Sequence, residues 1–230
     1  MMEGVSEITT QPLGVNTQEE KQRFINILNY TFRPGIQSLL DWLENDTDFF
    51  NAPASTKYHD AFDGGLLHHS LRVYDFMLAL DNNLQTGLDR DSIVIVSLFH
   101  DVCKANCYIK DWRNLKTYLP DKTVQYLGED IKGYKSDSRG YFMWESVPCY
   151  KMEEQQVYGG HGAKSVYLIH RLMQLSFDEA AAIHNHMGAY EDTSYGKSSS
   201  VYERNKLAFL LHLADELATF MPDDAIMQTE

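Results

Sequence analysis

The segment SLFHDVCKAN, residues 97–106, places a histidine and an aspartate directly after a run of apolar residues. The run SIVIVSLF, residues 92–99, is rich in β-branched side chains, so its period alone would also fit a buried strand. An Asp/Ser start and a total length of about 15 residues favour a buried helix. We therefore predict a buried helix that carries His100 and Asp101, with Lys104 on the face that both share.

A second segment, GGLLHHSL at residues 64–71, sets two adjacent histidines near the start of another predicted helix. Neighbouring residues on a helix diverge by about 100°, so His68 and His69 cannot both face the interior. The stretch before it, residues 51–65, has the composition of a loop. The apolar residues at helical spacing are Leu67, Leu71, Tyr74 and Leu78.

The clearest helical pattern lies near the C-terminal end, in VYERNKLAFLLHLADELATF at residues 201–220. Asp215 is four residues after Leu211 and three before Ala218, so it lies on or beside the apolar stripe. An ionised carboxylate that is buried there requires a cation, a metal or good hydrogen bonds. A buried ion pair, or a cap to a neighbouring helix, is the alternative.

Three further histidines occur in helical or helix-leading segments. His161 is flanked by glycines where a loop leads into a helix, and His184 and His186 are two residues apart. At most one of the latter pair can face a given site. A single histidine of this kind is usually a core or surface residue. Several imidazole and carboxylate groups on buried helices, however, suit a divalent transition ion, or magnesium where carboxylates dominate.

Two capping boxes predict helix starts. One is TQEE, with Thr17 as the N-cap and Glu20 three residues later, and the other is SFDE, with Ser176 and Glu179. Together with the apolar spacing along the chain they predict a mainly all-α fold.

The domain organisation follows from a change in composition. Residues 108–158 are rich in Tyr, Trp, Gly, Lys and Asp and lack a helical stripe, which predicts an irregular insertion with a small β-hairpin. We expect its aromatic side chains to pack the hairpin onto the helices; stacking on a nucleobase is the alternative. Residues 1–50 are predicted to form an N-terminal helical extension that packs on the core, and residues 51–222 the main domain.

Composition limits the classes of partner. The chain of 230 residues carries a formal net charge of −13, which opposes the binding of a long nucleic acid but is compatible with a small phosphorylated substrate. No stretch has the roughly 20 apolar residues of a membrane span, and no signal peptide pattern is present, so we expect a cytoplasmic location.

Cys103 and Cys107 are predicted to be small core residues, with a zinc pair as the alternative. The sequence is compatible with a homo-oligomer as well as with a monomer.

The order His, His-Asp, His, His, Asp along a helical chain resembles the HD superfamily of metal-dependent phosphohydrolases, from about residue 58 to residue 220. The segments that carry the resemblance are GGLLHHSLRV, LFHDVCKAN, GGHGAKS, IHNHMGAYE and LLHLADELAT. The resemblance implies an HD-domain helical bundle with one or two divalent ions (Mn²⁺, Mg²⁺, Fe²⁺, Ni²⁺ or Zn²⁺). It implies that the metal ligands are His69, His100, Asp101, His161, His186 and Asp215.

The resemblance also implies roles for these residues. Asp101 would bridge two ions and, with Lys104, serve catalysis, the lysine by neutralising charge on a phosphate. Members with two ions often have adjacent histidines, whereas His186 is followed here by Met187, so the second ion would have fewer ligands. The supporting residues would be His68, His184 and His212.

The activity implied is hydrolysis of a phosphate ester, a monoester or a diester, of a small nucleotide-like substrate by a metal-activated water. Two alternatives stay open. One is a nuclease similar to the 3′–5′ exoribonucleases of the superfamily, and the other is a non-catalytic module that senses a metal or a nucleotide.

Overall fold

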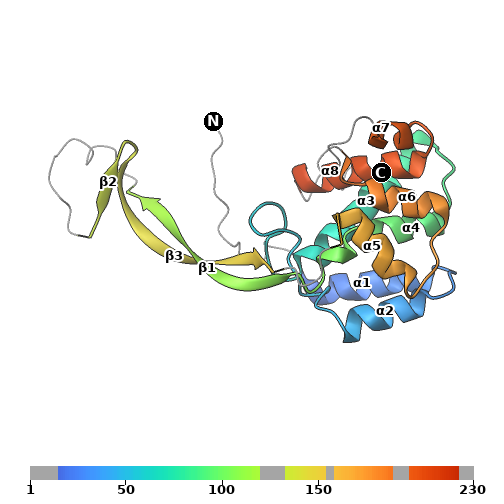
Figure 1. The fold of residues 1–230 in the computed structure, drawn as a ribbon, viewed down its shortest axis with the longest axis horizontal. Helices are drawn as coiled ribbons and strands as arrows, with labels where there is room; N and C mark the ends of the chain where they lie inside the picture. Colours follow the sequence, from blue (N-terminus) through green and yellow to red (C-terminus); the bar gives the residue numbers. More distant parts are fainter. Residues whose placement is uncertain (1–14, 120–132, 154–157, 189–196, 223–230) are drawn as a thin grey trace.

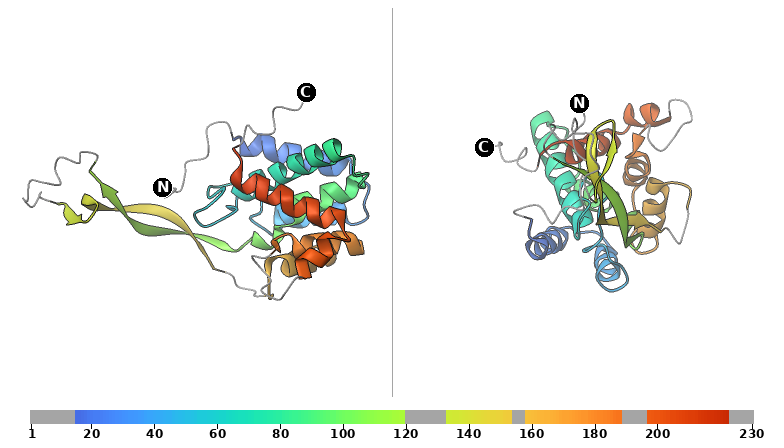
Figure 2. Two further views of the ribbon diagram at one scale, coloured as in Figure 1. Left: turned by 90° about the horizontal axis from the view of Figure 1, so that it is seen from above. Right: turned by 90° about the vertical axis from the view of Figure 1, so that its left-hand side faces the viewer.

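The computed structural model describes residues 15–119, 133–153, 158–188 and 197–222, and it shows a helical body from which a long β-arm projects (Figures 1 and 2). Among the described helices, none has the length and apolar character needed to cross a membrane. The helices of the body are α1 (Thr17–Asn29), α2 (Ile36–Asn45), α3 (Gly65–Leu84), α4 (Arg90–Phe99), the short 3-10 helix η1 (Val102–Lys104), α5 (His161–His170), α6 (Phe177–Asn185), α7 (Lys197–Tyr202) and α8 (Lys206–Phe220).

Helix α3 is the centre of the body. It packs against α8, α4 and α1, and it buries both of its faces, which explains why its histidines lie in an otherwise apolar segment. Phe24 of α1 sits among three other buried rings, with centroid distances of 5.5 Å to Phe49, 5.5 Å to Phe50 and 5.9 Å to Phe99. The two N-terminal helices thus share one hydrophobic core with the rest of the body.

One of the two predicted capping boxes is confirmed. The Ser176 hydroxyl accepts from the Glu179 amide, and the Glu179 carboxylate accepts from the Ser176 amide. The prediction at Thr17 is wrong, because Asn16 is the N-cap and its side-chain oxygen accepts from the amides at the start of α1. Asparagine is a stronger N-cap than threonine, so the helix begins at Thr17, one residue earlier than the motif suggested.

The predicted helix through SIVIVSLF is confirmed, but it ends before its polar residues. Helix α4 stops at Phe99, His100 is its C-cap, and Asp101 has φ −106° and ψ 17° before η1 begins. The side chains of these two neighbours meet, with His100 Nε2 3.4 Å from Asp101 Oδ2. The C-terminal helix also differs from the prediction, because α7 and α8 are separate and Asn205 caps α8 through the Ala208 amide.

The insertion forms a twisted antiparallel arm. Strand β1 (Tyr108–Tyr118) pairs with β3 (Gly140–Met152) along its whole length, and the short β2 (Lys135–Asp137) pairs with the other edge of β3. The predicted hairpin is thus confirmed and is longer than expected. The expectation that its aromatic rings pack it onto the helices is wrong for Trp112 and Trp144, which are 68% and 49% exposed.

The root of the arm is fixed to the body. The Glu153 amide donates to the Cys107 carbonyl at 2.8 Å, so the two ends of the arm meet. Asp63 of the body accepts from Tyr150 at 2.6 Å and pairs with Lys110 at 2.7 Å. Cys103 and Cys107 are buried, as predicted for small core residues.

Candidate metal centre

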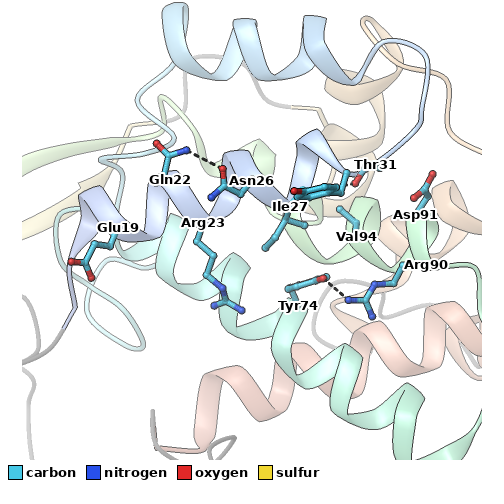
Figure 3. Close-up of a pocket in the computed structure, with 11 residues that line it drawn as sticks. Glu19, Gln22, Arg23, Asn26, Ile27, Thr31, Tyr74, Arg90, Asp91 and Val94 are labelled. Carbon is cyan, nitrogen blue, oxygen red and sulfur yellow. Dashed lines mark hydrogen bonds between the residues drawn. The ribbon is translucent and has the colours of Figure 1, made fainter.

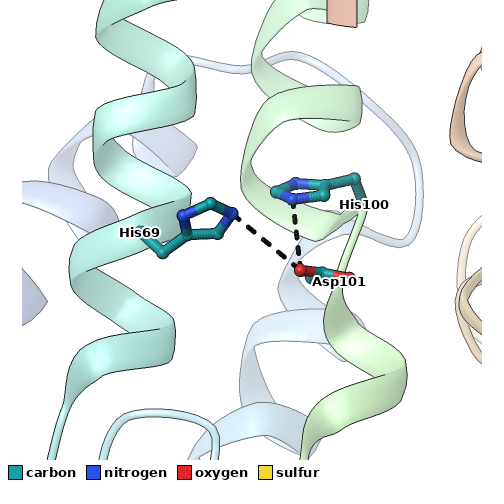
Figure 4. Close-up of side chains that lie close together, drawn as sticks. All are labelled: His69, His100 and Asp101. Atoms are coloured by element: carbon teal, nitrogen blue, oxygen red, sulfur yellow. Dashed lines mark ion pairs between the residues drawn. The ribbon is translucent and has the colours of Figure 1, made fainter. Parts of the chain in front are cut away.

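Four separate segments bring histidines and aspartates to one place inside the body. His69 comes from α3, His100 and Asp101 follow α4, His186 follows α6, and Asp215 belongs to α8. All five are buried. Figure 4 shows the side chains of His69 and His100 turned toward the Asp101 carboxylate. Two overlapping sets have ligand atoms that all lie within 4.8 Å of one another: His69, His100 and Asp101, and His100, His186 and Asp215.

The separations between these atoms fit a shared cation. His69 Nε2 lies 3.0 Å from Asp215 Oδ1 and 3.9 Å from Asp101 Oδ2, and His100 Nε2 lies 3.4 Å from Asp101 Oδ2. Ligands bound at about 2.1 Å would be separated by about 3.0 to 4.2 Å, depending on the angle at the ion. The side chains therefore have room for an ion with little rearrangement.

The tautomers of two histidines leave lone pairs facing the centre. His100 Nδ1 lies 2.8 Å from the Ser97 carbonyl and His186 Nδ1 lies 2.7 Å from the Ile183 carbonyl. Because a carbonyl only accepts, Nδ1 carries the proton in both rings and Nε2 is free to bind. Both Nε2 atoms are buried and lack a hydrogen-bond partner, as does Asp101 Oδ1. Buried polar atoms are nearly always satisfied, so this concentration indicates that the residues fit a divalent ion.

Asp101 faces two sides of the cluster. Its Oδ2 atom lies near His100 and pairs with Lys104 Nζ at 2.6 Å, while its Oδ1 atom lies 3.4 Å from His186 Nε2. Burial raises the pKa of Asp101, but the charge of Lys104 and the contacts with the histidines outweigh burial and hold the pKa well below its usual value. The carboxylate is therefore ionised and able to bind cations through both oxygens.

His69 is held between two carboxylates. Burial alone lowers its pKa, but the contacts with the Asp215 and Asp60 carboxylates outweigh burial and raise the pKa to about 9. Asp215 has a lowered pKa because its contact with His69 outweighs its burial. A divalent ion that binds His69 takes the place of a proton, so we expect metal binding to release a proton here.

The other predicted site residues lie at the margins of the centre. His161 begins α5, and its Nδ1 atom lies 3.7 Å from Cys103 Sγ. Within the described ranges, neither convergent set includes His161, so its role as a ligand stays a prediction. His212 donates from Nδ1 to the His186 carbonyl at 2.7 Å and so helps to fix the backbone of His186.

Two predicted supporting histidines point elsewhere. His68 Nδ1 lies 2.6 Å from Glu20 Oε1, which ties α3 to α1. His184 is exposed and lines a small cavity beside Gly159 and Gly160. Their support for the metal ligands stays a prediction.

Two residues beside the centre, His59 and Asp60, were not predicted from the sequence. The rings of His59 and His69 have centroids 4.8 Å apart, and Asp60 Oδ2 lies 3.5 Å from His69 Nδ1. Burial and the neighbouring His69 lower the pKa of His59 to about 4. The available signal was a second His-Asp pair, in KYHDAFDGG, but its segment has loop composition and no periodicity to indicate burial.

A larger cavity lies away from this centre. It has a volume of about 570 Å³ and lies between α1, α3 and α4 (Figure 3). Arg90 donates to the Tyr74 hydroxyl at 2.9 Å at one end of it. None of the convergent histidines and aspartates lines it, so the cavity and the centre are separate features.

Comparison with known proteins gives no relationship from which a family could be assigned. No family model matches the chain, and no solved structure matches it. The chemistry of the site therefore rests on its own geometry.

Proposed function

We propose that this chain is a metal-dependent phosphohydrolase of the HD superfamily that its motifs resemble. One observation carries the proposal: five imidazole and carboxylate side chains from four distant segments converge in the interior. Three of their atoms, His100 Nε2, His186 Nε2 and Asp101 Oδ1, have no hydrogen-bond partner. Three imidazoles and two carboxylates form a mixed N/O donor set, which favours Mn²⁺, Fe²⁺, Ni²⁺ or Zn²⁺ over Mg²⁺.

The ligands and their neighbours have distinct tasks in such an enzyme. His69, His100, Asp101 and Asp215 would hold one ion, and His186, with Asp101, would hold a second together with His161. A bound ion supplies Lewis acidity and lowers the pKa of a coordinated water.

Lys104 lies at the edge of the centre, where its ammonium group pairs with Asp101. Burial lowers the pKa of Lys104, but the charge of Asp101 outweighs burial and raises the pKa, so the lysine keeps its charge. A fixed positive charge here would stabilise the negative charge that develops on a phosphate.

The substrate we propose is a small nucleotide or a similar phosphate ester. The net charge of −13 opposes the binding of a long polyanion, whereas the local cations of the centre would neutralise a single phosphate group.

The test is hydrolysis with Mn²⁺ of mononucleotides, cyclic nucleotides, a generic aryl phosphate and a single-stranded oligonucleotide. Asp101→Ala should remove metal and lower the rate at least about 100-fold, because Lewis-acid stabilisation contributes several kcal/mol. Asp111→Ala, on the exposed arm, is the matched control and should retain both properties. Full retention of metal or of activity in Asp101→Ala would contradict the proposal. If only the oligonucleotide is cleaved, the chain is a nuclease and the proposed small substrate is wrong.

The depth of the centre favours a second candidate, a module that holds a metal without catalysis. His69, His100 and His186 have no exposed surface. A structural site has all its ligands supplied by protein, whereas a catalytic site keeps a position for water. A stoichiometric metal with no hydrolysis of any substrate in the panel would select this candidate.

A further inference from the structure

We propose that the loop at residues 51–64 is part of the metal centre, with Asp60 as a positioning residue for His69 and His59 as a further imidazole donor to the ion. The inference rests on the metal centre that underlies the proposed function. It concerns metal binding, so it can be tested without reference to hydrolysis.

The loop is held in one conformation by its own hydrogen bonds. The Ser55 hydroxyl donates to the His59 carbonyl at 2.7 Å and accepts from the Tyr58 amide at 2.9 Å. The Ala54 amide donates to the Asp60 carbonyl at 3.0 Å. These bonds fix the backbone on both sides of the His-Asp pair, so the two side chains are presented from a rigid support.

The conformation of Asp60 has an energetic cost that the surrounding structure must offset. Its φ of 47° lies in the left-handed region, which is uncommon for residues other than glycine. The backbone of Gly65, the first residue of α3, packs closely against the Asp60 carbonyl group. A Cβ atom at Gly65 would lie 1.9 Å from the Asp60 carbonyl oxygen, so only glycine fits at this position. Strained backbone of this kind is concentrated at functional sites.

Asp60 is placed to orient His69. Asp60 Oδ2 lies 3.5 Å from His69 Nδ1, and both atoms are buried without a hydrogen-bond partner. On the opposite side of the ring, Nε2 lies 3.0 Å from Asp215 Oδ1. A carboxylate that accepts from Nδ1 keeps the proton on that nitrogen and leaves the Nε2 lone pair for the cation. Asp60 therefore completes a carboxylate–histidine–metal arrangement.

His59 extends a row of imidazole rings. Successive ring centroids lie 4.8 Å apart from His59 to His69, 5.4 Å from His69 to His100 and 5.0 Å from His100 to His186. The Nε2 atom of His59 is shielded from solvent and has no hydrogen-bond partner. A shielded imidazole nitrogen next to a metal ligand, with no protein partner, is suited to bind the same cation or its neighbour.

The experiment compares Asp60→Asn and His59→Gln with Asp63→Asn, using the full chain. Asparagine tolerates the left-handed conformation, so Asp60→Asn keeps the loop fold while removing the charge. Asp63 lies in the same loop but pairs with Lys110 and Tyr150 at the root of the arm, which makes Asp63→Asn the matched control. Mn²⁺ affinity is measured by competition with a chelator. The visible spectrum of the Co²⁺-loaded protein reports the ligand set, and circular dichroism checks folding.

We expect Asp60→Asn to weaken Mn²⁺ binding about 10- to 100-fold. His59→Gln should weaken it by at least about 10-fold and change the Co²⁺ spectrum, since a ligand is lost. Asp63→Asn should match the unaltered chain.

Several outcomes would overturn the inference. Unchanged Mn²⁺ affinity and Co²⁺ spectrum in both variants would exclude the loop from the centre, and an equal loss in Asp63→Asn would show a general effect of the loop. An effect of Asp60→Asn alone would overturn the role of His59. Metal affinity that depends on Asp60 and His59, in a chain that hydrolyses nothing, would leave this inference standing and reject the proposed hydrolase.

Discussion

The helical body and the β-arm use similar residue types in opposite ways. The body buries His69, His100, His186, Asp101 and Asp215 among apolar side chains, where each carboxylate needs a cation or a hydrogen bond. The arm exposes its tryptophans and its charged side chains, where an ion pair has little effect on stability. The comparison teaches that residue type alone does not identify a role in this chain, because burial decides it. A buried polar group in the body indicates a functional site, whereas an aromatic ring on the arm does not indicate a hydrophobic core.

The largest difference should be found between two aromatic substitutions. Phe24→Ala, in the body, removes a ring packed among three others and should lower the free energy of unfolding by about 4 kcal/mol. Trp112→Ala, on the arm, should change it by less than about 0.5 kcal/mol because the side chain is largely exposed. Urea denaturation followed by far-UV circular dichroism measures both. Equal losses would show that the arm is part of the cooperative core.

Metal binding should stabilise the body through the buried centre. Mn²⁺ at 100 times its dissociation constant should add about 2.7 kcal/mol. For a chain of this size that corresponds to a rise of roughly 5–10 °C in the unfolding midpoint. Differential scanning calorimetry with Mn²⁺ and with a chelator measures the shift. Asp101→Ala is the control and should show no shift with Mn²⁺.

The buried ion pair between Arg33 and Glu179 should make stability depend on pH. Burial raises the pKa of Glu179, but the hydrogen bonds from Arg33, Ser176 and Ser92 outweigh it, so the pKa is lowered. Folding that lowers a carboxyl pKa adds stability above the pKa of the unfolded carboxyl, about 4.3, and loses that stability as the pH falls through the folded pKa.

Glu179→Gln should therefore cost about 2 kcal/mol at pH 7 and less as the pH falls below about 4. Urea denaturation across this pH range measures the loss. Glu145→Gln, on the exposed arm, is the matched control and should cost less than about 0.5 kcal/mol. A cost for Glu179→Gln that stays constant from pH 7 to pH 3 would contradict the assignment of the pKa.

The smallest effect is expected from removing the arm. Cys107 and Glu153 are joined by a hydrogen bond of 2.8 Å, so two glycines can replace residues 108–152. The shortened chain should keep its Mn²⁺ affinity and lose less than about 1 kcal/mol of stability. Titration with Mn²⁺ and thermal unfolding measure the two quantities. A loss of metal binding on removal of the arm would mean that the arm helps to build the centre.

Much of the body follows from local patterns in the sequence. Periodicity predicted the helices around His69 and Asp215, and the Ser176 capping box marked the start of α6. The end of α4 at Phe99 was not predicted, because the turn that brings His100 and Asp101 together depends on tertiary contacts. For the same reason the sequence pattern assigned the candidate ligands to separate helices, but it did not show that these side chains meet.

The misses have a common physical cause. The position of His59 depends on a loop whose hydrogen bonds and contact with Gly65 have no periodic signature. The exposure of Trp112 depends on the arm projecting from the body, which aromatic composition does not reveal. The partner of a side chain is determined by the fold and not by the neighbouring sequence.

The most direct test of the account is elemental analysis of the chain purified without added metal and again after incubation with Mn²⁺, in parallel with Asp101→Ala. The account predicts one or two equivalents of a divalent transition metal in the unaltered chain and a loss of that metal in Asp101→Ala. A chain that binds no metal under either condition, or a variant that binds as much as the unaltered chain, would contradict it.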